Sequence, residues 1–173
     1  MSLEQTISQT PDEPRAEDAE DATKGRGSEC GLSLKRTVAT TRLIMTENQL
    51  GKRILDLAFE IHTELGPGLL ETVYEVVLAH ELRGIGLEVE RQKPVPIVYR
   101  GLSFDEGFRA DLIVENKVIV ELKSVEALER VHAKQVLTQL RLTNLRLGYL
   151  INFGQERLKD GIKRLANRLV EPD

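Results

Sequence analysis

Two carboxylates and a lysine near the middle of the chain could carry out metal-dependent chemistry. Glu121 and Lys123 lie two residues apart in the run VIVELKS. They project from one side of a β-strand, because side chains alternate across it. Asp111 lies in the preceding apolar run, which a hairpin would place beside this strand. Two close carboxylates repel each other, so one pKa must rise unless a cation, such as a lysine or a divalent metal ion, lies between them.

The spacing of Glu121 and Lys123 also has a simpler explanation, which is an exposed ion pair on a strand surface. Such a pair contributes well under about 1 kcal/mol to stability. Asp111 is the residue that favours a site, and the pairing register of the two strands decides whether the carboxylates meet. If they lie on opposite faces of the sheet, or too far apart to share an ion, the hydrolytic hypothesis fails.

A sharp break between two helical runs places a further carboxylate near the start of the second run. Gly66, Pro67 and Gly68 end the first run, and Glu71 follows in the sequence ELGPGLLETVYE. Glycine permits backbone angles and close approaches that a side chain would forbid. A carboxylate in the first turn is favoured by the helix dipole. Glu71 therefore either caps the helix or reaches a site at the sheet.

The spacing of apolar residues predicts the elements that must position these side chains. Helices are expected over 46–65, 69–83, 128–143 and 155–169, and strand-like runs over 87–92, 95–101, 108–116, 117–124 and 146–153. Thr46 and Gln49 form a capping-box pattern at the first helix start. In the second helix, the residues expected to face inward are Leu70, Val73, Val77, Leu78 and Leu82. The predicted class is α/β, a mixed central sheet flanked by helices on both faces.

Composition limits the class of protein. The chain has 173 residues, a net charge of −4, no tryptophan and a single cysteine, Cys30. One cysteine excludes a disulfide framework or a cysteine-based zinc cluster, and it fits a reduced, cytoplasmic setting. No apolar run approaches the roughly 20 residues that span a bilayer, so no membrane partner is expected. Dense charge without apolar periodicity predicts a disordered N-terminal extension over 1–44, followed by one domain over 45–173.

The candidate residues resemble the active-site line of the PD-(D/E)XK nucleases. Asp111, then Glu121 and Lys123, and then a helix that contains Gln135 occur in the order of that superfamily. One departure is Ala110, which stands in place of the proline for which the superfamily is named. That proline carries no chemistry, so the departure has little weight.

A second resemblance lies upstream, in the run HTELGPGLLETVY. It is similar to the signature of the GxxExxY protein family, a branch of the same superfamily, with Gly68, Glu71 and Tyr74 at the three named positions. The resemblance covers residues 46–169. It implies a restriction-endonuclease-like core of order αβββαβ, in which Glu71 supplies a carboxylate from the first core helix.

The resemblance also implies a metal site for phosphodiester hydrolysis. Asp111 and Glu121 would be the main ligands of Mg²⁺, with Mn²⁺ as an alternative ion. The carbonyl of Leu122 would be a third ligand, and Glu71 would bind the ion directly or through water. Mg²⁺ prefers such oxygen ligands in octahedral geometry.

Other residues would have supporting roles in that site. Lys123 would orient the attacking water and offset charge in the transition state. Gln135 would hold the lysine or the water, and Gln139, one turn later, is the substitute for it. Gly66 and Gly68 would form the structural turn.

Three auxiliary residues remain open between a structural and a chemical role. His62 is either structural or a hydrogen-bond donor to the metal shell or a phosphate. Tyr74 either packs in the core with its hydroxyl satisfied or contributes to the site. Arg109 lies two residues before Asp111, so it faces the same side and could contact a phosphate.

Nucleic acid is the expected partner, with weak binding. The predicted last helix carries a basic set that would either face phosphates or form a solvated surface, namely Arg157, Lys159, Lys163, Arg164 and Arg168. The chain is nevertheless slightly acidic and shows no aromatic stacking platform, so binding assisted by a protein partner or a homo-oligomer is also open.

Two functional hypotheses follow from these residues. The first is a Mg²⁺-dependent nuclease-like hydrolase that cleaves phosphodiester bonds in DNA, RNA or a smaller substrate. The second is a non-catalytic domain that binds nucleic acid or protein and retains the nuclease fold. The presence of Lys123 favours the first, because binding alone does not require it. The acidic balance favours the second.

Overall fold

A computed structural model describes residues 45–169 of the chain. The extension expected over 1–44 lies outside the described residues. The elements in chain order are α1 (Glu47–Leu65), α2 (Glu71–Gly84), β1 (Val89–Tyr99), β2 (Leu102–Val114), β3 (Val118–Lys123), α3 (Arg130–Thr143), β4 (Leu147–Asn152), a short 3₁₀ helix η1 (Leu158–Gly161) and β5 (Ile162–Ala166). No helix within 45–169 is long and apolar enough to cross a membrane.

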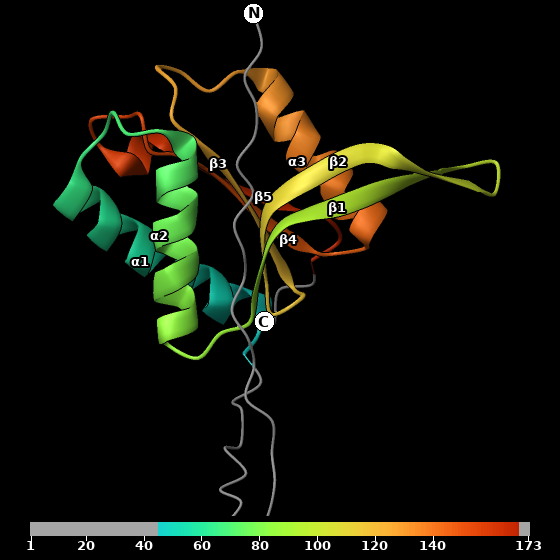
Figure 1. The fold of residues 1–173 in the computed structure, drawn as a ribbon, viewed down its shortest axis with the longest axis horizontal. Coiled ribbons are helices and arrows are strands. Elements are labelled where there is room, and N and C mark those ends of the chain that lie inside the picture. Colours follow the sequence, from blue (N-terminus) through green and yellow to red (C-terminus); the bar gives the residue numbers. More distant parts are fainter. Residues whose placement is uncertain (1–44, 170–173) are drawn as a thin grey trace, which may run out of the picture. The chain divides into compact units, whose positions relative to one another are not determined.

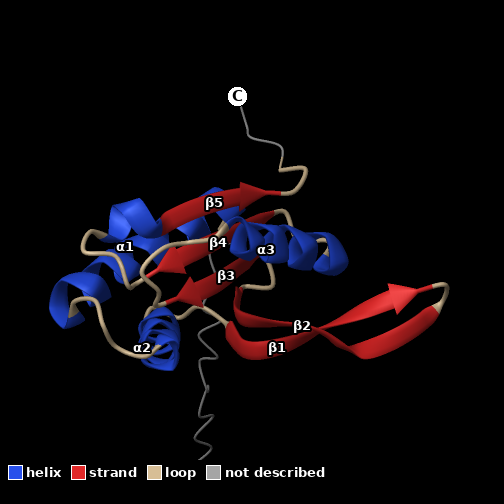
Figure 2. Cartoon of the chain, turned by 90° about the horizontal axis from the view of Figure 1, so that it is seen from above, coloured by secondary structure: helices blue, strands red, loops and turns tan. Residues whose placement is uncertain are grey.

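Five strands form one mixed sheet in the order β1-β2-β3-β4-β5. The pairs β1–β2, β2–β3 and β4–β5 are antiparallel. The pair β3–β4 is parallel, since α3 carries the chain back between these two strands. Helices α1 and α2 lie on one side of the sheet and α3 on the other (Figures 1 and 2). The expected mixed sheet with an αβββαβ core is therefore confirmed.

Each face of the sheet has its own hydrophobic core. Val118, Val120 and Leu122 of β3 pack in the core that contains α1 and α2. Ile119, from the opposite side of the same strand, packs with Val136 and residues near it in α3. This division confirms the predicted alternation of β3, including a deeper apolar position on its polar side.

The break between α1 and α2 has the predicted backbone. Helix α1 begins with the predicted capping box, in which the Thr46 side chain accepts the N–H of Gln49 and the Gln49 side chain accepts the N–H of Thr46. At its other end, α1 is capped by Gly66, whose φ is 69°, and Gly68 has a φ of 106°. Both angles favour glycine, because a Cβ atom is strained there.

The helix predicted over 155–169 is wrong, because this segment forms η1 and β5 instead. Leu158, Ile162 and Leu165 have helical spacing, but Leu158 lies in η1, and the three-residue step from Ile162 to Leu165 also suits a strand with one partly buried apolar residue on each face. Ile162 packs on the α1–α2 side and Leu165 on the α3 side. Gly161 lies so close to the carbonyl of Asn152 that a Cβ atom would not fit, which brings β5 against β4.

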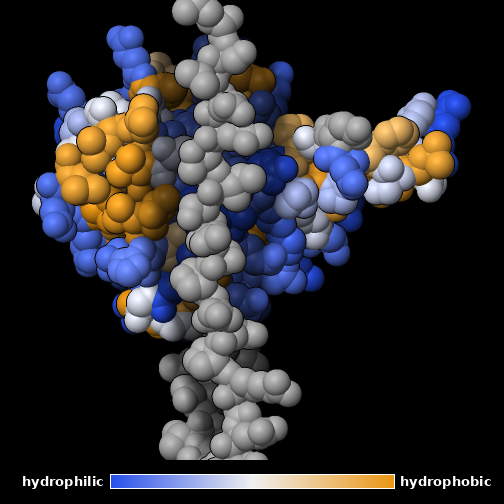
Figure 3. Space-filling model, viewed as in Figure 1, coloured by the Kyte–Doolittle hydropathy of each residue, from blue (hydrophilic) through white to orange (hydrophobic). Residues whose placement is uncertain are grey.

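The inward face predicted for α2 was partly wrong. Leu70 and Val73 are exposed, Leu70 at 74%, while Tyr74, Leu78 and Leu82 are fully buried. The buried residues repeat every four positions from the tyrosine, so the buried face is turned by one residue at its start. Figure 3 shows an apolar surface over α1 and α2, the helices that carry exposed apolar residues such as Phe59, Leu70 and Val73.

Strands β1 and β2 extend beyond the sheet as a two-stranded arm (Figures 1 and 2). The two runs expected at 87–92 and 95–101 form one strand that includes Pro94. Proline lacks a backbone N–H and is tolerated here because β1 is an edge strand. The β1–β2 register shifts between Val95 and Ile97.

Candidate active site

Asp111 and Glu121 meet on neighbouring strands. Ile113 pairs with Ile119 across β2 and β3. Asp111 and Glu121 each lie two residues from that pair, so they share its face of the sheet. The Oδ2 atom of Asp111 accepts the backbone N–H of Leu122 at 2.8 Å. The two carboxylates are 9% and 7% exposed, which makes them buried neighbours.

Burial controls the protonation of these two groups. Burial raises the pKa of Asp111, although the hydrogen bond from Leu122 and the charge of Lys123 act in the opposite direction. Burial also raises the pKa of Glu121, and the nearby charge of Asp111 raises it further. Without a further cation, the pair therefore holds protons more tightly than exposed carboxylates do.

The ammonium group of Lys123 lies among three oxygen atoms. Its Nζ is 3.1 Å from Glu121 Oε1, 3.3 Å from Glu71 Oε1 and 2.6 Å from the carbonyl oxygen of Leu122. Burial acts to lower the pKa of Lys123, but Glu121 and Glu71 outweigh it, and the pKa is raised. Asp111, Glu121, Lys123 and Glu71 are called the acidic cluster below.

The turn before α2 is fixed to the end of β3, which explains how Glu71 reaches the cluster. The Tyr74 hydroxyl donates to the carbonyl of Gly66 at 2.6 Å and accepts the N–H of Leu69 at 3.2 Å. The Ser124 hydroxyl donates to the carbonyl of Leu69 at 2.7 Å. Glu71 is the first residue of α2, directly after this turn. Tyr74 thus packs in the core with its hydroxyl satisfied.

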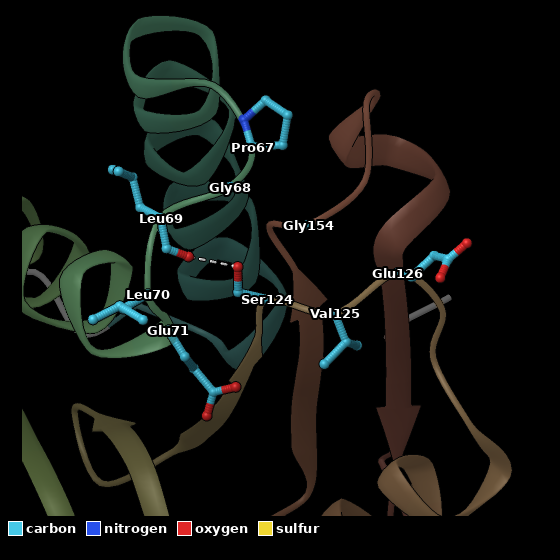
Figure 4. A pocket seen from close by; sticks show the side chains of 9 residues that line it. All are labelled: Pro67, Gly68, Leu69, Leu70, Glu71, Ser124, Val125, Glu126 and Gly154. Atoms are coloured by element: carbon cyan, nitrogen blue, oxygen red, sulfur yellow. Dashed lines mark hydrogen bonds between the residues drawn. The ribbon is translucent and has the colours of Figure 1, made fainter.

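An open cavity of about 570 Å³ lies beside Glu71, between this turn and the segment after β3 (Figure 4). The lining residues are Pro67, Gly68, Leu69, Leu70, Glu71, Ser124, Val125, Glu126 and Gly154. Its side chains include two carboxylates and none that is basic. A phosphate group would therefore not be attracted by the walls of this cavity alone.

His62 and Asn152 fix the loops that follow β3 and β4. His62 Nε2 lies 2.8 Å from the carbonyl oxygen of Gln155 and donates to it. The fully buried Asn152 accepts the N–H groups of Val125 and Gly154 through Oδ1, and it donates to the Val125 carbonyl through Nδ2. His62 therefore contacts a loop rather than the acidic cluster. Asn152 was not among the residues that the sequence analysis expected to have a role.

Helix α3 contributes Gln139 to the cluster rather than Gln135. Gln139 is 2% exposed, and its Nε2 donates to Glu121 Oε2 at 3.2 Å. Its Oε1 is buried without a hydrogen-bond partner among residues 45–169. Gln135 is partly exposed, and its side chain makes no hydrogen bond to the cluster within the described part of the chain. Arg109 lies at the surface and donates to the carbonyl of Gln92 at 2.8 Å.

Sequence reasoning missed a polar network behind Asp111. Glu75 is 3% exposed and accepts Arg91 Nε at 2.8 Å. Gln92 Nε2 donates to Glu75 Oε2 at 2.7 Å and to Asp111 Oδ1 at 3.1 Å. Glu75 follows Glu71 by one helical turn, so its place beside the cluster could have been predicted from the sequence. No sequence pattern pointed to Gln92.

The oxygen atoms of the cluster fit a hard divalent cation. Three of them already converge on the positive charge of Lys123 Nζ. Oxygen donors suit Mg²⁺ and Mn²⁺. In residues 45–169, no three His, Cys, Asp or Glu side chains form a metal site by themselves. The two carboxylates of Asp111 and Glu121 therefore need a third donor of another kind, and the Leu122 carbonyl oxygen, which contacts the same Lys123 Nζ as Glu121, is a candidate.

Comparison with protein families gives one match. A family described as the PD-(D/E)XK nuclease superfamily matches residues 48–165, which include all four residues of the acidic cluster. No curated protein and no solved structure matches the chain. The mixed sheet with its flanking helices is that of a restriction-endonuclease-like fold.

Proposed function

The chain belongs to the PD-(D/E)XK nuclease superfamily, and on that premise we propose that residues 45–173 form a magnesium-dependent hydrolase that cleaves phosphodiester bonds in nucleic acid. Nucleases of this superfamily typically use divalent metal ions. The observation that carries the proposal is the meeting of buried Asp111 and Glu121 beside the ammonium group of Lys123.

We also propose that the chain belongs to the GxxExxY branch. The three named positions lie in one turn, directly after it, or in contact with its backbone. Gly68 forms the turn, Glu71 begins α2, and the Tyr74 hydroxyl holds the backbone of the turn. All three residues of the signature are associated with this turn, so their match supports membership of the branch better than three unrelated residues would.

The residues of the cluster divide the chemistry among them. Asp111, Glu121 and the Leu122 carbonyl would hold Mg²⁺, with Glu71 bound directly or through water. When bound, the ion supplies charge neutralisation at a phosphoryl oxygen and increases the acidity of water. Lys123 orients the attacking water and offsets negative charge in the transition state. Gln139, through its hydrogen bond, keeps Glu121 in place.

Binding of nucleic acid is expected to be weak. The basic residues expected on a last helix do not form one stripe, because Lys163 and Arg164 are consecutive in β5 and project from opposite faces. The Glu71 and Glu126 carboxylates beside the site oppose phosphates as well. The proposal therefore includes a protein partner or a second copy of the chain that adds basic surface. It also includes a reduced, cytoplasmic setting for the protein.

The test is a cutting assay with labelled single- and double-stranded DNA and RNA in Mg²⁺, Mn²⁺ or EDTA. Lys123→Ala should lower metal-dependent cutting by about a hundredfold or more, as expected when a group that stabilises transition-state charge is removed. Equal cutting by both proteins would identify a contaminating nuclease. Tight binding without cutting by the wild-type protein would favour the non-catalytic alternative.

The stability of the metal-free protein should fall as pH rises above the usual carboxyl range. Asp111 and Glu121 have raised pKa values, compared with 3.8 and 4.5 for the ordinary groups. The folded state therefore binds more protons than the unfolded state above this range, and ionisation destabilises it. The raised pKa of Lys123 acts in the same direction, because its stabilisation is present below the unfolded pKa and is lost at alkaline pH.

Urea unfolding in EDTA between pH 4 and pH 8 measures this effect, with Glu121→Gln as the reference. The variant should gain stability relative to wild type as pH rises, by at most about 1.4 kcal/mol per pH unit for one proton. A constant difference across this range would contradict the raised pKa of Glu121. Saturating Mg²⁺ should stabilise the wild-type protein more at pH 8 than at pH 4, because the ion binds ionised carboxylates.

A further inference from the structure

Gln92 of β1 links two buried carboxylates, of which one belongs to the acidic cluster. Its amide nitrogen donates to Glu75 Oε2 and to Asp111 Oδ1. Both partners are carboxylate oxygens, so the amide can only present its NH₂ group to them. The other oxygen of Asp111 accepts the Leu122 N–H. Each Asp111 oxygen thus has one fixed hydrogen bond and retains a lone pair for a metal ion.

An irregularity in the sheet brings Gln92 to this position. Its two neighbours in β1 pair with the two neighbours of Asp111, so Gln92 faces Asp111 across the ladder. The register shifts between Val95 and Ile97. Had the register beyond the shift continued, Glu90 would face Asp111 and add a fourth carboxylate to the acidic cluster. The shift replaces that anion with a neutral donor.

The backbone of Gln92 is in a conformation that its residue type disfavours. Its φ is 51°, in the left-handed region that mainly glycine and asparagine adopt. The carbonyl of this residue accepts Arg109 Nη1 at 2.8 Å, which helps to hold it. Such strain persists where the surrounding structure fixes it, often at functional sites. Glycine would suit the backbone better, so the side chain is the feature that needs an explanation.

Glu75 supports Gln92 from the side away from the cluster. This carboxylate is almost completely buried, and its two oxygens are satisfied by Arg91 and by Gln92. A buried anion with few donors holds them firmly, because losing one leaves an unsatisfied charge. Glu75 thereby limits the movement of the Gln92 amide.

We infer that Gln92, held by Glu75, is a positioning residue that fixes Asp111 in the orientation required for metal binding. The inference rests on the proposed function, because it assigns Asp111 as a ligand. Hydrogen-bond partners of metal ligands typically contribute about tenfold to a hundredfold to metal affinity. Neither residue touches the substrate in this assignment.

The experiment uses the full chain with Gln92→Gly and Gln92→Met. The glycine variant relieves the backbone and removes the amide, while the methionine variant keeps the length and removes only the hydrogen bonds. Calorimetry with Mn²⁺ should give a dissociation constant about tenfold to a hundredfold higher for both variants. The kcat for cutting should fall similarly, with an unchanged KM for nucleic acid. Urea unfolding in EDTA should show the glycine variant to be at least as stable as the methionine variant.

Asn144→Gly is the matched control. Asn144 has a φ of 56° at the end of α3, so the change relieves a similar backbone without touching the acidic cluster. It should keep wild-type Mn²⁺ affinity and kcat. If Gln92→Met does not fold, Gln92→Asn replaces it, because asparagine suits the backbone but is too short to join Glu75 to Asp111.

The outcomes separate the inference from the proposed function. A wild-type protein that binds Mn²⁺ and cuts, together with Gln92 variants that do both equally well, overturns the inference alone. The inference is also overturned if the Gln92 variants lose Mn²⁺ affinity only in proportion to their loss of folded protein. A wild-type protein that neither binds Mn²⁺ nor cuts overturns the proposed function and the inference with it.

Discussion

Glu121→Ala should reduce metal-dependent cutting by about a thousandfold or more, which corresponds to about 4 kcal/mol of transition-state stabilisation. The change removes one of the two main carboxylate ligands of the proposed site, and the donors that remain should bind Mg²⁺ poorly. The fold should remain intact in EDTA, because Glu121 is a buried anion whose neighbour Asp111 repels it. Lys123 would keep its contacts with Glu71 and the Leu122 carbonyl.

Cutting assays and thermal unfolding in EDTA together measure this prediction. Glu60→Ala, which removes an exposed carboxylate from α1, is the control and should change neither quantity. A large fall in melting temperature of the Glu121→Ala protein without metal would show that the carboxylate is structural. Full activity of that protein would remove the basis of the proposed metal site.

Tyr74→Ala should lower the free energy of unfolding by about 3–5 kcal/mol, the usual cost of removing a large aromatic side chain from a core. The Tyr74 ring is fully buried and stacks on Phe153, with ring centres 4.3 Å apart. Its hydroxyl also holds the backbone of Gly66 and Leu69. The alanine variant loses both contributions, and urea unfolding measures their sum.

Tyr74→Phe separates the hydroxyl from the ring. It should cost about 0.5–1.5 kcal/mol, the usual net contribution of a hydrogen bond, because the carbonyl of Gly66 and the N–H of Leu69 lose their partner in a partly exposed turn. Cutting should also fall, since the turn that places Glu71 is released. Tyr99→Phe, on the exposed arm, is the control and should leave stability unchanged. Equal stability of Tyr74→Phe and wild type would show that water replaces the hydroxyl without cost.

Local rules predicted that the strands of Asp111 and Glu121 are neighbours, but they left open whether the two carboxylates share a face. Alternation gave the relative faces within each strand, and the turn near Glu115 and Asn116 made the strands neighbours. The carboxylates share a face because the observed register pairs Val114 with Val118, which leaves three residues in the turn. The sharp turn at Gly66 and the start of α2 followed from residue types as well. These features require no knowledge of distant parts of the chain.

The last segment could not be predicted from the spacing of its apolar residues. A helix with one buried face and a strand with two buried faces both accept apolar residues three and four positions apart. The sheet around Ile162 and Leu165 decided between them, since each side chain enters a different core. The basic stripe expected for a helix disappears for the same reason.

The hydrogen-bond network of Gln92 and Glu75 behind Asp111 could not be predicted, because it depends on the β1–β2 register. Pairing counted from the tip of the hairpin places Glu90, not Gln92, opposite Asp111, and only the shift near Val95 corrects it. Such a shift depends on packing between strands and has no fixed sequence pattern. The choice between Gln135 and Gln139 depends on the rotation of α3 about its axis, which directs Gln139 toward Glu121.

The contacts of the acidic cluster span very different lengths of chain, and this has a consequence for the nascent protein. Asp111 and Leu122 are 11 residues apart, whereas Lys123 and Glu71 are 52 residues apart. Short loops close sooner than long ones, because less chain entropy is lost. The carboxylates of the hairpin can therefore come together before α2 docks. A half-folded chain would lack Glu71 and a finished site, so that the proposed cutting activity would require complete folding.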